Sequence, residues 1–367
     1  MNRAMSEAGV QGADGRSHVV DLRSDTVTQP TSAMYQRILD APLGDDALDG
    51  DPTACELEEK GARILGKEAA LFVPSCTMAN LLAALVHVRR GEQLVLEADA
   101  HMYVMERGAA TFTGAFYAPV SGTDGQMDLE ALQDAISPGP RSRLRTGMIA
   151  LETTHNNAGG TVLPLPHMAT IHRMGSERGI ALHVDGARLF NAAVYLGVAP
   201  AEITQYCDTV SLCLSKGLSA PMGAILAGPQ RIIHEARSLR RMLGGQQRQV
   251  GIVAAAGIEA VTVMGGRLLE DHVRARRLSR VVREAHSLLK AKEPQTNIVQ
   301  VDVCASGRSA AEWAVELASH GLRVRPWSKW LLRCVTHRHI EDDDIEYAGH
   351  AFSQAAYNFN IKGSFEG

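Results

Sequence analysis

The chain has 367 residues, which is enough for a large domain with an ample hydrophobic core and a smaller second domain. Its hydrophobic content of 45% and charged content of 21% are ordinary for a soluble globular protein, and its net charge of -4 argues against a nucleic-acid or anionic-membrane surface. The six cysteines show neither a CxxC pair nor zinc spacing, so we expect reduced thiols, no metal site and a cytoplasmic protein.

Ordered structure is expected to begin near Val19, because residues 1–18 lack the apolar run of a signal peptide and are typical of a flexible tail. The segment DLRSDTVTQPT predicts an extended arm. Its Ser24 could fold over a site, although serine is also common in ordinary loops. A loop rich in Gly and Asp, which includes Leu48, then leads into an amphipathic helix.

The segment AALFVPSCTMANLLAAL predicts a strand, a tight turn and a helix that starts at Ser75, Cys76 and Thr77. Free N–H groups and the positive end of the helix dipole bind phosphate at such a turn, and the Thr77 hydroxyl would add a donor. Simple N-capping by Ser75 or Thr77 explains the same residues without a ligand. The motif therefore indicates a phosphate site only in combination with others.

Two histidines follow expected strand ends. His101 comes after EQLVLEADA, where its imidazole could stack on a cofactor ring or play a structural role. His155 precedes Asn-Asn-Ala-Gly-Gly in a loop that we expect to be mobile. Strands alternate with helical patterns to about residue 270, which predicts a mostly parallel sheet with right-handed crossovers.

The segments LHVDGARLFNAA and DTVSLCLSKGLSAP each predict a short apolar strand that ends in a polar residue, Asp185 in the first and Lys216 in the second. In an open parallel sheet, ligands bind beyond these carboxyl ends. A lysine amine that forms a Schiff base and a carboxylate that keeps a pyridine nitrogen protonated are the pair that pyridoxal phosphate requires. Arg188 lies about one helical turn after Asp185, within reach of the cofactor or of a substrate carboxylate.

Two further arginines are candidates near the end of the chain. Arg248 follows a Gly-Gly turn and could serve a phosphate or could be solvated. Arg333 is embedded in an apolar strand, where it must face solvent or meet a carboxylate. We expect a large domain at residues 19–270 and a small C-terminal α/β domain at residues 271–367.

These residues together resemble the threonine aldolase family of pyridoxal phosphate enzymes. The matching strings are DLRSDTVTQPT, GKEAALFVPS-x-TMAN, LETTHNNAGGTVLPL, LHVDGARLFNA, CLSKGL-x-AP-x-G and RRMLGGQQRQ-x-G, and the match runs from about Val19 to beyond residue 340. The resemblance implies an α/β fold of type I, like that of aspartate aminotransferase, and an oligomer whose active sites lie at subunit interfaces. It also implies cleavage of a β-hydroxy-α-amino acid to glycine and an aldehyde.

On the cofactor side, the resemblance implies that Lys216 is the Schiff-base lysine, that Asp185 pairs with the pyridine nitrogen and that His101 stacks on the ring. It also implies cofactor contacts at Cys76, Thr77 and Arg248, to which we add Ser75 and Arg188 from their positions in the sequence. For the substrate α-carboxylate it implies Ser24, Arg188 and Arg333, and we add Leu48 and His155 as candidates near the substrate.

Three departures from the family pattern fall near the substrate. Leu48 stands where a tyrosine is usual, and Cys76 stands where the phosphate turn usually has glycine. No histidine lies between Ala118 and Glu152, where many members have one, and Ser142 is the residue that aligns there. We therefore expect a shifted substrate. Racemisation, β-elimination and transaldol chemistry on the same fold remain the alternative.

Overall fold

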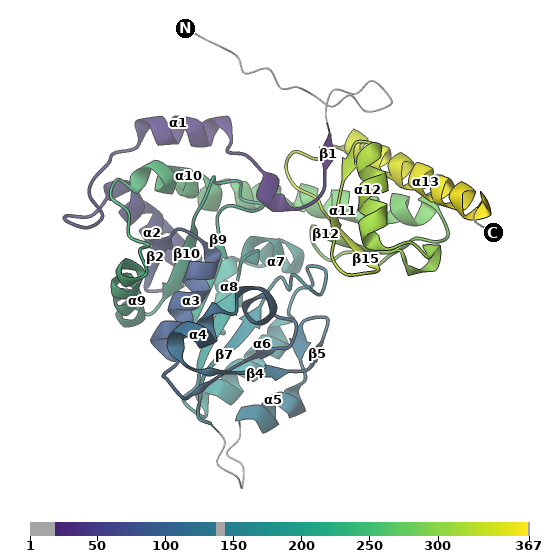
Figure 1. Ribbon diagram of the computed structural model, residues 1–367. Coiled ribbons are helices and arrows are strands. Elements are labelled where there is room, and N and C mark those ends of the chain that lie inside the picture. Colours follow the sequence, from purple (N-terminus) through teal and green to yellow (C-terminus); the bar gives the residue numbers. More distant parts are fainter. Residues whose placement is uncertain (1–18, 137–143, 366–367) are drawn as a thin grey trace. The chain divides into compact units, whose positions relative to one another are not determined.

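The computed structural model describes residues 19–136 and 144–365, which form two compact units (Figure 1). One unit is Thr28–Leu269, and the other combines the N-terminal segment up to Val27 with the chain from Glu270 onward. The expected tail at residues 1–18 and the aligned residue Ser142 lie outside the described residues.

A seven-stranded sheet forms the centre of the first unit, in the order β2-β10-β9-β8-β7-β3-β4. All of its strands are parallel except β10, which is antiparallel to both neighbours. This confirms the predicted α/β fold with a mostly parallel sheet. The strands are β2 (Ala69–Val73), β3 (Gln93–Glu97), β4 (Phe116–Val120), β7 (Thr146–Glu152), β8 (Ala181–Asp185), β9 (Thr209–Cys213) and β10 (Ala224–Gly228).

Hydrophobic cores cover both faces of this sheet, as the continuous apolar strands require. In β2, Ala70 and Phe72 join one core, whereas Leu71 and Val73 join the other, because successive side chains point to opposite faces. The helices of the unit are α1 (Ser32–Asp40), α2 (Pro52–Ile64), α3 (Cys76–His87), α4 (Gly108–Thr113), α5 (Leu129–Ile136), α6 (Leu165–Ser176), α7 (Leu189–Leu196), α8 (Pro200–Thr204), α9 (Gln230–Met242) and α10 (Gly251–Thr262). A short hairpin of β5 (Gly122–Thr123) and β6 (Gln126–Met127) lies outside the main sheet.

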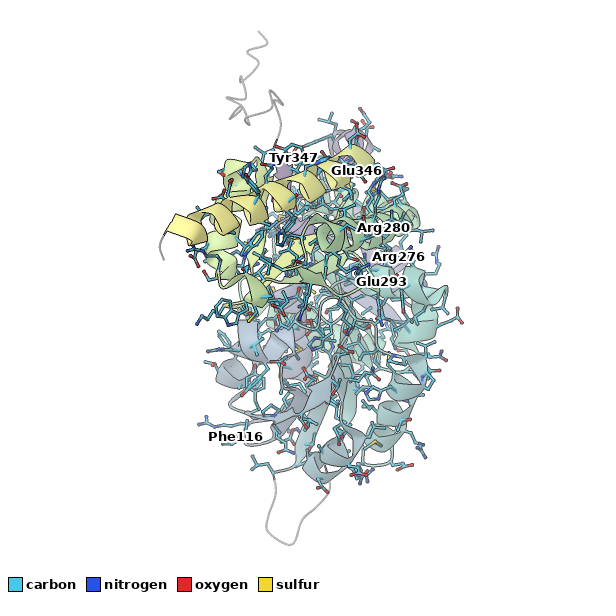
Figure 2. The ribbon with its side chains drawn as sticks, turned by 90° about the vertical axis from the view of Figure 1, so that its right-hand side faces the viewer. Phe116, Arg276, Arg280, Glu293, Glu346 and Tyr347 are labelled. Atoms are coloured by element: carbon cyan, nitrogen blue, oxygen red, sulfur yellow. The ribbon has the colours of Figure 1, made fainter. Side chains whose placement is uncertain are left out.

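The second unit is built on a four-stranded antiparallel sheet in the order β11-β12-β15-β14. These strands are β11 (Lys290–Ala291), β12 (Ile298–Asp302), β14 (Arg325–Pro326) and β15 (Leu331–Val335). Trp313 is fully buried in its core. The helices are α11 (Leu268–Ala285), α12 (Ala310–Ser319) and α13 (Asp342–Phe365), and Figure 2 shows the side chains of Glu346 and Tyr347 on α13.

The N-terminal arm belongs to this second unit. Strand β1 (Val20–Asp21) pairs in parallel with β13 (Leu322–Arg323), and Val335 donates a backbone hydrogen bond to Leu22. The domain boundary that we expected at residue 270 would put this arm in the large domain. Backbone pairing between residues some three hundred positions apart in the sequence instead groups the arm with the C-terminal part of the chain.

Within the described residues, no single helix has both the length and the apolar composition to cross a membrane, while one bent pair, Gly251–Thr262 with Met264–Ala285, meets both criteria jointly. All six cysteines are free thiols.

Candidate active site

Asp185 ends strand β8 as a buried carboxylate with two fixed hydrogen bonds. The residue is 3% exposed. Its carboxylate accepts hydrogen bonds from Asn80 Nδ2 at 2.9 Å and from the Ala187 backbone N–H at 3.0 Å. Burial and the nearby charge of Glu106 raise the pKa of this carboxyl, although Lys216 and His101 oppose the shift. A buried carboxylate of this kind is stabilised by a cation placed against it.

Asn80 connects Asp185 to a second carboxylate and to the next strand. Its Nδ2 also donates to Glu106 at 3.1 Å, and its Oδ1 accepts a bond from the Ser211 hydroxyl at 2.8 Å. The His183 ring lies 3.1 Å from the same Oδ1. These contacts fix the amide orientation, so Asn80 holds the Asp185 oxygens in place.

His101 lies beside Asp185 and is held at two points. Its Nδ1 is 3.1 Å from Glu106, and its backbone N–H donates to Glu152 at 2.6 Å. Burial lowers the pKa of the imidazole, but the hydrogen bond to Glu106 and the charge of Asp185 outweigh burial and raise it. The contact fixes Nδ1 on Glu106 and leaves Nε2 for another partner.

Lys216 follows β9 and is partly exposed. Its backbone carbonyl accepts bonds from the Thr28 hydroxyl and the Ser219 N–H, both at 2.9 Å, which fixes the turn that carries it. Its charge acts on Asp185 and on Cys213. In the described part of the chain, Nζ takes part in no hydrogen bond or ion pair. The amine is therefore available for a ligand near Asp185.

The predicted phosphate turn is a helix N-terminus. Ser75 is the N-cap of α3, and its hydroxyl accepts a bond from the Met78 N–H at 3.2 Å. Among the described residues, the N–H groups of Cys76 and Thr77 donate to no protein acceptor. Ser75 therefore acts as the capping residue, and two neighbouring N–H groups are available for an anion.

Arg188 is 5% exposed, and one of its terminal nitrogens donates to Asn156 at 3.4 Å. The neighbouring end of β7 contributes Thr153, whose N–H donates to the Asp185 carbonyl. The hydroxyl of the next residue, Thr154, is buried and has no hydrogen-bond partner among the described residues. A buried hydroxyl without a partner is uncommon, and this one is available to donate to a ligand.

His155 occupies a different position from the one we predicted. The residue is 1% exposed, with Nε2 3.1 Å from Glu97 and 3.8 Å from Glu152, and with Nδ1 accepting a bond from the Ala158 N–H at 3.2 Å. Both ring nitrogens are engaged inside the protein, so the imidazole does not face a substrate. It lies against Glu152, the last residue of β7, which in turn accepts a hydrogen bond from the His101 backbone N–H.

Two other predicted residues lie on the surface. Leu48 is 78% exposed in a turn. The Arg248 side chain is 68% exposed, and its guanidinium lies 3.6 Å from Asp45. Neither side chain is placed against Asp185 by any contact in the described part of this chain.

Ser24 and Arg333 belong to the second unit and are neighbours there. Arg333 is 3% exposed, stacks on the Trp327 ring at 4.2 Å and donates to the Arg23 carbonyl at 3.3 Å. Ser24 follows Arg23 and its hydroxyl accepts a bond from the Thr26 N–H at 3.3 Å. The aromatic face of Trp327 is thus one partner of the buried guanidinium, a partner that we did not predict.

Pyridoxal phosphate fits the residues present in the first unit. Asp185 would hold the pyridine nitrogen, Lys216 the aldehyde carbon, and the start of α3 the phosphate, while Thr154 has a hydroxyl to donate. His101, Glu106 and Asp185 also bring ligand atoms within 4.8 Å of one another, a spacing that a metal ion could bridge. Asn80 already donates hydrogen bonds to the carboxylates of Asp185 and Glu106, so an organic cation suits the site better than a metal ion does.

Comparisons with known proteins point to the same chemistry. The family model described as beta-eliminating lyase matches residues 21–306. Low-specificity L-threonine aldolase 1 from Arabidopsis thaliana is 38% identical over 343 residues, which cover 92% of this chain and 96% of the relative. Low specificity L-threonine aldolase from Escherichia coli (strain K12) is 39% identical over 335 residues, covering 90% and 98%.

Solved structures share the fold at lower sequence identity. Leishmania major threonine aldolase has a TM-score of 0.76 at 14% identity, covering 92% of this chain and 99% of that chain. Sphingomonas wittichii serine palmitoyltransferase has a TM-score of 0.75 at 18% identity, covering 97% and 92%.

Proposed function

The chain belongs to the beta-eliminating lyase family, and we propose that the site around Asp185 and Lys216 carries its reaction. The protein is a pyridoxal phosphate-dependent carbon–carbon lyase of fold type I, similar to the threonine aldolases. It cleaves a β-hydroxy-α-amino acid to glycine and an aldehyde. The observation that carries the residue assignment is the buried Asp185 carboxylate, with a lysine that has no protein partner beside it.

When bound, pyridoxal phosphate supplies an electron-withdrawing ring that accepts the electrons left by cleavage of the Cα–Cβ bond. Asp185 favours the protonated ring nitrogen by charge attraction. Lys216 would provide the covalent attachment point, and His101 would cover the ring. The N–H groups of Cys76 and Thr77 would bind the phosphate, and Arg248, which is exposed, would reach the phosphate of a neighbouring subunit.

On the substrate side, arginine is suited to holding a carboxylate in one orientation because its N–H groups can bind both oxygens at once. We assign Arg188 of the first unit to the substrate α-carboxylate, and the resemblance to the threonine aldolases assigns Arg333 and Ser24 the same role. Their role is to orient the Cα–Cβ bond relative to the cofactor plane. This orientation lowers the barrier to cleavage by more than the binding energy of the contacts alone.

A base must also remove the β-hydroxyl proton, and we assign that role to Nε2 of His101. Glu106 holds Nδ1 of the same ring, which fixes the orientation of the imidazole. The raised pKa of His101 favours the imidazolium that forms when Nε2 takes this proton.

The substrate is shifted from threonine in this proposal. Support comes from Leu48 and Cys76 at positions that carry tyrosine and glycine in the family pattern, and from the missing histidine between Ala118 and Glu152. An apolar Leu48 in place of a hydroxyl group favours a β-substituent that is larger and more apolar than a methyl group.

The test is a product assay on the holoenzyme with threonine, allo-threonine, phenylserine and serine. We expect glycine and the matching aldehyde from at least one of the β-hydroxy substrates, with phenylserine cleaved better than threonine. Pyruvate and ammonia, or only an amino acid inverted at Cα, would instead identify elimination or racemisation as the reaction.

We also propose a homodimer or homotetramer in the cytoplasm. The similarity to the threonine aldolases supports the oligomer, and the exposed side chain of Arg248 is placed at the surface, where a neighbouring subunit would meet it. The six free thiols support a reducing compartment.

A further inference from the structure

Four buried polar side chains lie together on one face of the central sheet, beneath α3. Strand β8 contributes His183 and Asp185, and its neighbour β9 contributes Thr209 and Ser211. Residues two apart on a strand project to the same face, and the register places His183 beside Thr209. Asn80 of α3, which is also fully buried, forms hydrogen bonds with three of the four side chains, those of Asp185, His183 and Ser211.

The directions of these hydrogen bonds follow from the two carboxylates. Asn80 Nδ2 lies 2.9 Å from Asp185 and 3.1 Å from Glu106, and only the NH2 end of an amide can donate to a carboxylate. Oδ1 is therefore the amide atom that lies 3.1 Å from Nε2 of His183, and it must accept. A bare Nε2 would set two acceptors against each other, so this ring nitrogen carries a proton.

We propose that His183 is a positioning residue of the lyase reaction: a neutral imidazole, protonated at Nε2, that holds the Asn80 amide with its nitrogen towards Asp185. The role rests on the proposed function, in which Asp185 pairs with the pyridine nitrogen of the cofactor. The Ser211 hydroxyl donates to the same Oδ1 at 2.8 Å. Two donors on the oxygen therefore oppose rotation of the amide, which would turn that oxygen towards two carboxylates.

Burial keeps the His183 ring neutral. The residue is 0% exposed, and burial lowers the pKa of its imidazole to about 3, with the nearby charge of His87 acting in the same direction. A neutral imidazole with its proton on Nε2 has an acceptor at Nδ1. The Thr209 hydroxyl lies 3.0 Å from that nitrogen and donates to it.

The chain of hydrogen bonds extends to the far end of α3. Nε2 of the partly exposed His87 lies 3.1 Å from the Thr209 hydroxyl oxygen, whose own proton is directed at His183. His87 is therefore the donor in this contact. Every donor along the chain points towards Asp185, so the position of each proton supports the orientation of the next group.

Two substitutions separate the hydrogen bond of His183 from the packing of its ring. His183→Phe keeps a ring but has no donor, whereas the side-chain amide of His183→Gln can donate from near the position of Nε2. We expect the apparent Kd for pyridoxal phosphate, measured by titration of the visible absorbance, to rise about tenfold in His183→Phe and to stay within about twofold of wild type in His183→Gln. His234→Phe makes the same change at an exposed histidine on α9 and should leave this Kd unchanged.

Either of two results would overturn the positioning role. An equal rise in Kd for both His183 variants would show that only the shape of the ring matters. A wild-type Kd in His183→Phe would show that the Asn80 amide needs no donor from this residue.

The proton itself is read in the wild-type apoprotein, so this reading stands even if His183→Phe fails to fold. The protein is labelled with nitrogen-15 histidine, and long-range proton–nitrogen correlation spectra are recorded at neutral pH, with the His183 signals assigned by their absence from the spectrum of either variant. We expect a neutral ring with its proton on Nε2, and a proton on Nδ1 or a charged ring would overturn the inference. Failure of the proposed function would look different, as a wild-type protein that binds no pyridoxal phosphate while His183 keeps its Nε2 proton.

Discussion

The Asn80 side-chain amide donates a 2.9 Å hydrogen bond to the buried carboxylate of Asp185. The same nitrogen reaches Glu106 at 3.1 Å, and Glu106 in turn holds His101. One residue of α3 thus links the proposed partner of the cofactor nitrogen to the proposed base. The orientation of both groups depends on this amide.

Replacing Asn80 with alanine should weaken cofactor binding. The change removes the side-chain donor to the buried Asp185 carboxylate and one of the two contacts to Glu106, which costs about 1–3 kcal/mol. We expect a 10- to 100-fold rise in the apparent Kd for pyridoxal phosphate, roughly the same free energy, measured by titration of the visible absorbance. Asn358→Ala, which loses an amide bond to Glu316, is the control and should leave this Kd unchanged.

Glu106→Gln should move the acidic limb of the pH–activity profile. Glu106 raises the pKa of His101, so removal of its charge lowers that pKa. A base works only when deprotonated, and activity should therefore rise at a lower pH than in wild type. An acidic limb that stays in place would exclude His101 as the group that titrates there.

His155 should make the stability of the apoprotein depend on pH. Burial lowers the pKa of His155, but Glu152 and Glu97 outweigh burial and raise it above its ordinary value of 6.5. This contribution is therefore complete below the unfolded pKa and is lost as pH rises through the folded pKa. Urea unfolding should show wild type losing stability as pH rises above the ordinary histidine pKa of 6.5.

The His155→Gln variant is the matched test of that dependence. It leaves two buried carboxylates without a charged partner, so it should be destabilised by about 3–5 kcal/mol at pH 6. Its stability should change less than that of wild type over the same pH range. Parallel curves for the two proteins would show that another group titrates.

Leu48→Tyr tests the proposed shift in substrate. If this position selects the β-substituent, the variant should cleave threonine faster relative to phenylserine, by about fivefold, because one hydrogen bond to a substrate contributes on the order of 1 kcal/mol. The ratio of acetaldehyde to benzaldehyde released from an equimolar mixture measures it. An unchanged ratio would remove Leu48 from the account of specificity.

The sequence predicted the parts of the site that lie at strand ends. Asp185 and Lys216 follow short apolar strands, and local pattern is enough to place such residues at one edge of a parallel sheet. Asn80 and Glu106 were missed. The available signal for Asn80 was one amide in the otherwise apolar helix α3, while Glu106 ends an irregular π-helical turn that has no sequence period.

Long-range pairing accounts for the other differences. Nothing local to Val20 indicates that it pairs with Leu322, and nothing local to Arg333 indicates that Trp327 stacks on it. His155 was expected on a mobile loop because Asn and Gly follow it. Its burial depends on Glu97, which comes from a different strand and is 58 residues away in the sequence.

The central claim is that Lys216 holds the cofactor, and its most direct test is chemical. The holoenzyme is reduced with borohydride, digested, and searched by mass spectrometry for the lysine that carries the pyridoxyl group. We predict that the group is found on Lys216, that Lys216→Ala is colourless after gel filtration, and that Lys60→Ala stays yellow. A pyridoxyl group on a different lysine, or a wild-type protein that takes up no cofactor, would contradict the account.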